Sequence, residues 1–194
     1  VTYKAGAGGE IGWTWLAGAK PDGYTIGGVD LPHIVLQPML RPEGQPGYKT
    51  DQLNPLCCLV FDPDILIVSE KSPFKSFREL IDHAKANPGK VKAATVGKRA
   101  GDHLFLMNVE KLTGAKFTQV PYPGGSKAAP ALLSGEVDCY FASTSNFLRT
   151  QGARGLAIAT GERYELCPDV PTLSELGCKL ESAKYRGLAT PPDF

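Results

Sequence analysis

The 194 residues of this chain include 21 Lys and Arg against 20 Asp and Glu, which leaves a formal net charge of +1. This balance lacks the basic excess of nucleic-acid-binding and anionic-membrane-binding proteins, so we expect neither kind of partner. Hydrophobic residues make up 42% of the chain, and no apolar run approaches the ~18 residues of a membrane-spanning helix. We therefore expect a globular protein, long enough to bury about 70% of its unfolded surface, with a small molecule as its partner.

The five cysteines show no metal-ligand pattern. CxxC and Cys/His spacings are absent, so we expect no metal site. Cys57 and Cys58 begin an apolar run and are expected to be small core residues. Cys167 and Cys178 flank a short predicted helix, which leaves a disulfide between them open. The chain begins without the basic and apolar regions of a signal peptide, so composition does not set the compartment.

A glycine-rich stretch, Gly6 to Gly12, separates a predicted strand end at Val1 to Tyr3 from a short helix. Its GxGxxxG spacing is one residue longer than the dinucleotide-binding GxGxxG. Asp30 closes the next predicted strand, Tyr24 to Val29, where such proteins carry a ribose-binding acid. The helix is cut short by Pro21-Asp22-Gly23, and the glycines also suit close packing of a helix on a sheet. A nucleotide site remains open here.

The next part of the chain, Pro32 to Pro55, is rich in proline, glycine and glutamine. This composition predicts a surface excursion with one short helix near Ile34 to Leu40. Two apolar, strand-forming segments follow, Leu59 to Phe61 and Ile65 to Val68. We expect Asp62-Pro63-Asp64 to break the strand between them.

Two capping boxes mark expected helix starts. Ser76-Phe77-Arg78-Glu79 opens a helix that ends near Asn87-Pro88-Gly89. Thr172-Leu173-Ser174-Glu175 opens a second, short helix that ends at Gly177.

The stretch from Thr95 to His103 joins a predicted strand, Val91 to Val96, to a predicted helix. Its glycines let the backbone approach a ligand, and the first amides of a helix lack intrahelical partners at the positive end of the dipole. Lys98 and Arg99 add formal charge. The junction therefore predicts an anion site, although a plain connection with two solvated basic residues fits the same pattern.

Two more strand-to-helix junctions follow. The strand Phe117 to Val120 leads into a glycine-bearing turn with Ser126 as the expected N-cap. The strand Val137 to Ala142 ends in Ser143-Thr144-Ser145-Asn146, which lines a pocket or caps the next helix. Gly124 to Ala128 also approaches the GxSxG elbow of serine hydrolases, but Ala128 replaces the last glycine.

Strands that alternate with helices, including a further strand at Gly155 to Ala159, predict an α/β fold with a mostly parallel sheet and helices on both faces. Ligands of such sheets bind beyond the carboxyl ends of the strands.

Five motifs stand in order along nearly the whole chain. They are Gly6-Ala7-Gly8-Gly9, Pro21-Asp22-Gly23-Tyr24-Thr25, Val120-Pro121-Tyr122-Pro123-Gly124-Gly125, Leu133-Ser134-Gly135-Glu136-Val137-Asp138 and Pro168-Asp169-Val170-Pro171-Thr172-Leu173-Ser174-Glu175-Leu176-Gly177. Together they resemble the Bug-type substrate-binding receptors of tripartite tricarboxylate transporters.

The resemblance implies a type II periplasmic binding protein with two hinged lobes of mixed, mostly parallel sheets. Such a receptor closes over a small organic carboxylate (a di- or tricarboxylate, an acidic amino acid or an aromatic acid) and passes it to membrane permease subunits. The resemblance further implies a monomer in the periplasm, no catalysis and no cofactor.

In this family, main-chain amides of a glycine-rich junction before a His-Leu pair hold a ligand carboxylate. The resemblance places that junction before His103-Leu104. Many relatives carry a glycine and a Ser or Thr where this chain has Arg99 and Ala100, so a charged contact from Arg99 is the alternative to the missing hydroxyl.

The expected ligand-binding residues lie on the three junctions and on one strand. They are Thr95, Gly97, Lys98, Arg99, Ala100, Gly101, Tyr122, Gly124, Gly125, Ser143, Thr144 and Asp30. The amides of the first two junctions are expected to hold a carboxylate, and Asp30 and Ser143-Thr144 to shape selectivity.

Crossing strands near Ile65 to Val68 and near Glu181 to Gly187 are expected to divide the chain into lobe 1, residues 1–67 and 182–194, and lobe 2, residues 68–181. Family members usually have a further strand and loop before this region and helices after it, so we expect lobe 1 to be incomplete. Two other functions remain open: a nucleotide-dependent enzyme using Gly6 to Gly12, and a solute sensor that signals to a partner protein.

Overall fold

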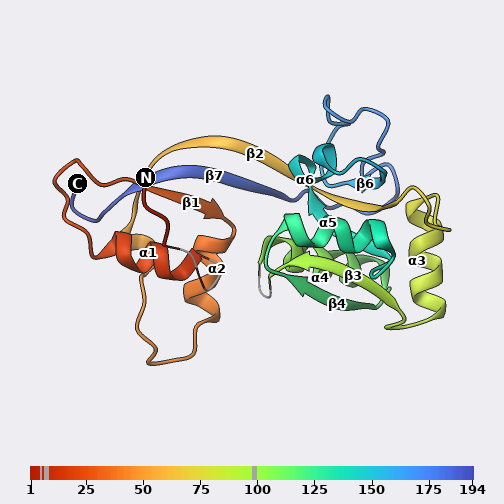
Figure 1. The fold of residues 1–194 in the computed structure, drawn as a ribbon, viewed down its shortest axis with the longest axis horizontal. Helices are drawn as coiled ribbons and strands as arrows, with labels where there is room; N and C mark the ends of the chain where they lie inside the picture. Colours follow the sequence, from red (N-terminus) through yellow and green to blue (C-terminus); the bar gives the residue numbers. More distant parts are fainter. Residues whose placement is uncertain (5, 7–8, 98–99) are drawn as a thin grey trace. The chain divides into compact units, whose positions relative to one another are not determined.

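The computed structural model describes residues 1–4, 6, 9–97 and 100–194 and divides the chain into two compact units (Figure 1). Unit 1 comprises Val1–Phe61, Arg99–Gly101 and Lys184–Phe194. Unit 2 comprises Asp62–Lys98 and Asp102–Ala183.

Unit 1 packs two short helices against three strands. The helices are α1 (Glu10–Ala17) and α2 (His33–Leu40), and the strands are β1 (Gly27–Leu31), β7 (Ala183–Thr190) and the first half of β2 (Asn54–Ser69), in the order β1-β7-β2. A 3-10 turn, η2 (Thr50–Gln52), precedes β2. β1 runs antiparallel to β7. The core is formed by Trp13, Leu16, Val29, Ile34, Tyr48, Leu53 and Ala189.

Unit 2 is built on a mixed sheet with the strand order β6-β2-β5-β3-β4. Its further strands are β3 (Val91–Val96), β4 (Phe117–Tyr122), β5 (Cys139–Ser143) and β6 (Ala153–Ile158), and its helices are α3 (Phe77–Ala86), α4 (Gly101–Thr113), α5 (Gly125–Ser134) and α6 (Thr144–Arg149). β3 is parallel to β4 and β5, whereas β2 is antiparallel to β5 and β6.

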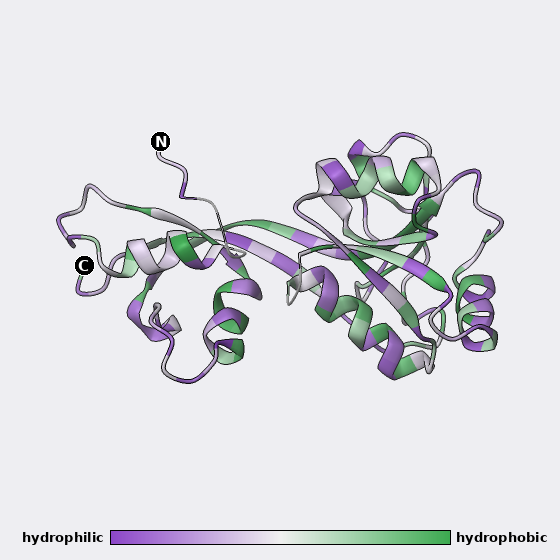
Figure 2. Ribbon diagram, turned by 60° about the horizontal axis from the view of Figure 1, so that its bottom comes forward, coloured by the Kyte–Doolittle hydropathy of each residue, from purple (hydrophilic) through white to green (hydrophobic). Residues whose placement is uncertain are grey.

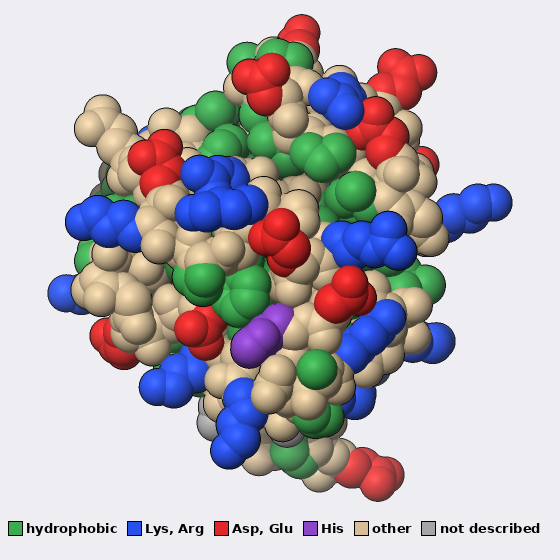
Figure 3. Space-filling model, turned by 90° about the vertical axis from the view of Figure 1, so that its right-hand side faces the viewer, with side chains coloured by type: hydrophobic (Ala, Val, Ile, Leu, Met, Phe, Trp, Pro, Cys, Tyr) green, Lys and Arg blue, Asp and Glu red, His purple; other side chains and the backbone are tan. Residues whose placement is uncertain are grey.

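Helices cover both faces of this sheet. Successive residues of a strand point to opposite faces, so neighbouring residues pack against different helices. Leu66 and Phe141 pack with side chains of α3 and α4, whereas Ile65 and Tyr140 pack with side chains of α5. Figure 2 shows hydrophobic residues along these strands and mixed colouring on the helices. Figure 3 looks onto the end of unit 2 that carries α3, where acidic and basic side chains are interspersed.

Strand β2 is one continuous strand of 16 residues, so the expected break at Asp62-Pro63-Asp64 is wrong. The two carboxylates are buried and their charges have partners inside unit 2: Asp62 accepts from Ser145 Oγ at 2.6 Å, and Asp64 accepts from Ser182 Oγ at 2.6 Å. These long-range partners let a charged, proline-containing segment remain in the strand.

The first half of β2 lies at the surface. Residues 55–61 are all exposed, so the expectation that Cys57 and Cys58 are core residues is wrong. All five cysteines are free thiols, and Cys167 and Cys178 form no disulfide.

Other local expectations also need correction. Val1 to Tyr3 form no strand, and the strand expected at Tyr24 to Val29 is found at Gly27–Leu31. The bonds of the second capping box are present, with Thr172 N–H donating to Glu175 Oε2 at 2.7 Å, but they close a turn and not a regular helix.

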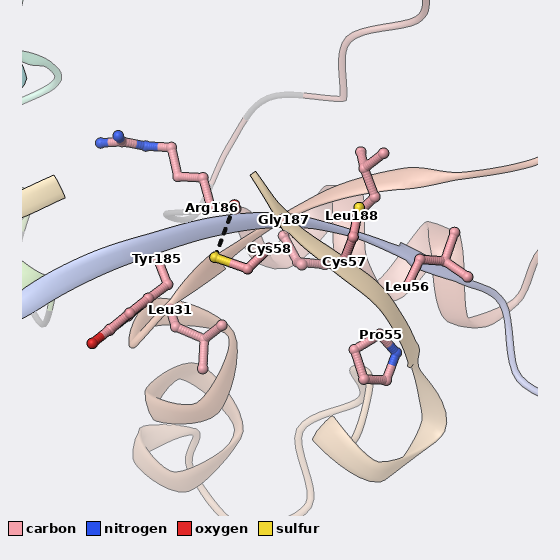
Figure 4. Close-up of a pocket in the computed structure, with 10 residues that line it drawn as sticks. Leu31, Pro55, Leu56, Cys57, Cys58, Tyr185, Arg186, Gly187 and Leu188 are labelled. Carbon is pink, nitrogen blue, oxygen red and sulfur yellow. Dashed lines mark hydrogen bonds between the residues drawn. The ribbon is translucent and has the colours of Figure 1, made fainter. Parts of the chain in front are cut away.

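Gly187 of β7 lies close to the backbone of the neighbouring strand β2, and Figure 4 shows Cys57 and Cys58 of β2 next to it. A Cβ at this position would collide with the carbonyl oxygen of Cys57. We predict that Gly187→Ala lowers the free energy of unfolding by about 1–3 kcal/mol in urea denaturation, because main chain cannot move aside as a flexible side chain can.

Gly28→Ala is the matched control on the neighbouring strand β1, since a Cβ at Gly28 would meet nothing within 4 Å. Equal stability losses for the two variants would contradict a role for Gly187 in the close approach of β2.

The capping box at α3 is present: Ser76 Oγ accepts from Glu79 N–H at 3.2 Å. The N-cap of α5, by contrast, is Gly124 and not Ser126. We predict that Ser76→Ala lowers the free energy of unfolding by about 1 kcal/mol, whereas Ser126→Ala changes it by less than about 0.5 kcal/mol. Urea denaturation would measure both, and a larger loss for Ser126→Ala would show that Ser126 is the true cap.

Candidate ligand-binding site

Three helices of unit 2 begin at one edge of its sheet. Because β3, β4 and β5 are parallel, their carboxyl ends lie together. They are followed by α4 at Gly101, α5 at Gly125 and α6 at Thr144. The positive ends of these helix dipoles therefore meet at the edge where ligands of such sheets bind.

The start of α5 offers the clearest donors. Lys127 and Ala128 donate their N–H groups to the carbonyl of Gly124 at 3.0 and 3.1 Å. The N–H groups of Gly125 and Ser126 precede them and have no intrahelical acceptor. A Cβ on Gly125 would lie 2.5 Å from Asn146 Oδ1, so glycine is what allows the side chain of α6 to pack against this turn.

The turn after β3 is tied back to the sheet. Gly97 has a φ of 76° and donates its N–H to the carbonyl of Tyr122 at 2.9 Å. Thr95 is fully buried, and its hydroxyl accepts from Gln119 Nε2 at 2.8 Å. Asp102 Oδ2 accepts from Val96 N–H at 2.8 Å. The Gly97 amide expected to hold a ligand is therefore already used, and Thr95 is an interior residue.

The rest of this turn is only partly described. Ala100 is buried. Gly101 belongs to unit 1, as Ala100 does, and donates its N–H to Nε2 of His33 in the same unit at 3.2 Å. The Gly101 amide is thus engaged as well. Lys98 and Arg99, the two expected charged contacts, lie outside the described residues.

Ser143 and Thr144 are buried and belong to an internal hydrogen-bond network. Thr144 Oγ1 donates to the carbonyl of Pro63 at 2.9 Å, and Ser143 Oγ lies 3.1 Å from Ser145 Oγ and 3.2 Å from Asn146 Nδ2. These hydroxyls are therefore used in internal hydrogen bonds that hold the residues after β5 in position.

The network also includes residues that the sequence did not single out as site residues. Asp62 accepts from both the N–H and the hydroxyl of Ser145, and Asn146 Nδ2 donates to the hydroxyl of Tyr140 at 3.2 Å. Arg149 Nη2 donates to Asn146 Oδ1 at 3.1 Å. Burial raises the pKa of Tyr140 well above its usual range, so its hydroxyl stays neutral. The run of polar residues after β5 was the only sequence signal for this network.

Two further expected residues have partners of their own. The hydroxyl of Tyr122 donates to Glu136 Oε1 at 2.7 Å, and desolvation together with this bond raises the pKa of Tyr122 to about 12. Asp30 lies in unit 1 on β1, with His33 Nδ1 and Arg186 Nε each 3.9 Å from its carboxylate oxygens.

The glycine-rich stretch near the start of the chain lacks the setting of a dinucleotide site. Such a site needs a strand before the glycines and a parallel strand after the helix. Residues 1–4 form no strand, and β1, which carries Asp30, pairs with β7 in antiparallel fashion. Ala7 and Gly8 lie outside the described residues.

Within the described part of the chain, no group of three or more His, Cys, Asp or Glu side chains is arranged to hold a metal ion. No helix among the same residues is long and apolar enough to cross a membrane.

We predict that Asp62→Ala lowers the free energy of unfolding by about 1–3 kcal/mol, because Ser145 would lose the acceptor for two partly buried donors. Urea denaturation would measure the loss. Asp82→Ala is the control, since that side chain is 64% exposed and should change stability by less than about 0.5 kcal/mol. An Asp62→Ala protein as stable as the control would contradict the role of this carboxylate in the network.

Comparisons with known proteins agree with this architecture. The family model described as tripartite tricarboxylate transporter family receptor matches residues 1–193. The UPF0065 protein in the gbd 5'region of Cupriavidus necator is 34% identical over 194 residues, which cover 98% of this chain and 58% of that protein.

Solved structures show the same similarity. The periplasmic binding protein BugD is 30% identical with a TM-score of 0.85, and the match covers 97% of this chain and 64% of BugD. MatC from Rhodopseudomonas palustris with bound malate is 27% identical with a TM-score of 0.83, and the match covers 97% of this chain and 65% of MatC.

The chain thus spans less than two thirds of the length of each of these relatives. The matches confirm the α/β periplasmic-binding-protein fold and the resemblance to Bug-type proteins, and they do not favour a nucleotide-dependent enzyme. The matching family is one of receptors and not of enzymes, and the chain belongs to this tripartite tricarboxylate transporter receptor family.

Proposed function

We propose that this chain belongs to a periplasmic receptor that binds a small organic carboxylate and delivers it to the membrane permease subunits of a tripartite tricarboxylate-type transporter. The observation that carries the proposal is the meeting of three helix starts at the carboxyl edge of unit 2, with two amides at the first turn of α5 that have no intrahelical acceptor. Similarity to MatC, whose structure contains malate, favours a di- or tricarboxylate.

In the proposed mode of binding, a ligand carboxylate accepts hydrogen bonds from the N–H groups of Gly125 and Ser126. Hydrogen bonds to a charged group contribute about 1.5–3 kcal/mol when the group is desolvated. The packing of Asn146 against Gly125 holds the amides in place before the ligand arrives, which lowers the entropy cost of binding.

Other residues are proposed to contribute charge and shape to the binding site. Lys98 and Arg99 follow β3 in the chain and would add positive charge for the carboxylate. Tyr122 and Gly124 would shape the wall beside the α5 amides.

We predict that Ser126→Pro weakens carboxylate binding by about tenfold or more, because proline removes one amide donor at a first-turn position where a helix tolerates it. Ser126→Ala keeps the amide, loses only the hydroxyl and should bind within about twofold of the parent chain. Isothermal titration with succinate, malate, citrate and glutamate would measure the affinities, and melting temperatures would verify that both variants fold.

Two results would contradict the proposal. A folded parent chain that gives no heat with any of the four acids would argue against a carboxylate receptor. Equal affinities for the proline and alanine variants would argue against main-chain recognition at α5.

A further inference from the structure

A pocket of about 420 Å³ lies at the edge of unit 2 opposite to the starts of α4, α5 and α6. It forms where β2 ends and where β6 and α3 begin. The strand register places Arg154 of this pocket opposite Val68, near the end of β2, whereas Ser143 lies opposite Asp64, several residues earlier in that strand. The pocket is therefore separate from the amides of α5.

Arg154 is the unusual group in this pocket. The side chain is half-buried, and its Nη1 atom is buried with no hydrogen-bond partner in the described part of the chain. Glu70 and Asp169, the acidic residues of the pocket wall, are exposed. A buried guanidinium nitrogen without an acceptor is unfavourable, and the guanidinium that carries this nitrogen belongs to a residue that lines the pocket.

The remaining lining is largely apolar and is held in place by main-chain bonds. Phe77, Phe147, Leu156, Val170 and Leu176 contribute the apolar walls. Ile158 donates its N–H to the carbonyl of Pro171 at 3.0 Å and accepts from Leu173 N–H at 2.8 Å, which fixes the segment containing Val170 along β6. The pocket is thus preformed and falls within the usual size range of small-molecule sites.

We propose that this pocket is a second binding site, for a small carboxylate with an apolar body. The planar carboxylate would accept hydrogen bonds from the guanidinium of Arg154, a geometry that suits this pair of groups. The apolar body would pack between Phe77 and Phe147. Lys75, whose Nζ donates to the carbonyl of Ser72 at 2.6 Å, adds a second positive charge beside the pocket.

A monocarboxylate fits this surface better than a phosphate. A dianion would be repelled by Glu70 and Asp169, and the apolar walls would offer it few donors. The guanidinium of Arg154 and the apolar walls together match one negative charge on an apolar group.

Benzoate is the probe for the test, with benzamide as the neutral molecule of the same shape. Titration of the full chain, followed by NMR of backbone amides, should show saturable shifts near Phe77 and Gly155 with benzoate and much smaller shifts with benzamide. Arg154→Gln should weaken benzoate binding by about tenfold, because it removes the charged donors.

Arg78→Gln is the matched control, since the side chain of Arg78 is 90% exposed and should leave benzoate binding unchanged. Arg154→Lys keeps a positive charge without the planar fork and should retain part of the affinity. Arg154→Gln should melt at the same temperature as the parent chain or higher, because it removes an unsatisfied buried group.

Three results of the benzoate titrations would overturn the proposal, and a competition experiment with malate adds a fourth. They are equal affinity for benzoate in the Arg154→Gln variant, equal shifts with benzamide, and shifts confined to the amides of Gly124 to Ser126. Saturating malate should leave the affinity for benzoate unchanged; competition between the two would show that the pocket is not a separate site. Shifts near Phe77 and Gly155 report on this pocket, whereas the Ser126 variants report on the proposed receptor site, so the failure of either proposal would not count against the other.

Discussion

The parallel pairing of β3 with β4 and β5 is the constraint on which the candidate site depends. Parallel strands need crossover connections, and in unit 2 these are helices that return to the opposite edge of the sheet. Each new helix therefore starts where its strand ends, and three helix starts come together without any charged side chain being required. The antiparallel strand β2 then closes the other side of β5 and brings Asp62 to the same edge.

The polar groups at this edge are of two kinds. Some are main-chain amides without an intrahelical acceptor, and the others are side chains that hold these amides in position. Ser143, Thr144 and Asp62 are buried, and their side chains are hydrogen-bonded to Asn146, to the carbonyl of Pro63 and to Ser145, respectively. A buried network of this kind is stable only when its members are paired, so each of these residues is more important to the shape of the site than to direct contact. The open donors are main-chain amides of α5, whose direction is set by the helix itself.

Local features of this fold could be predicted from the sequence, and long-range ones could not. The capping box at Ser76 and the limits of β3 depend on neighbouring residues, and both are present as expected. The continuity of β2 depends on Ser145 and Ser182, which lie 83 and 118 residues from their aspartate partners, so Asp62-Pro63-Asp64 resembled a break. The family was predictable because its motifs are local. The use of the Gly97 amide was not, since its acceptor belongs to the adjacent strand β4.

The pairing of β1 with β7 has a consequence for the order of folding. Gly27 pairs with Ala189, so unit 1 joins segments from distant parts of the chain, and closing such a long loop is slow and entropically costly. Folding of unit 2 shortens that loop, because Asp64 N–H bonds the carbonyl of Ser182 at 2.9 Å and so brings the ends of the intervening chain together. A folded unit 2 therefore lowers the entropy cost of pairing β1 with β7, and during synthesis this pairing requires that β7 has left the ribosome.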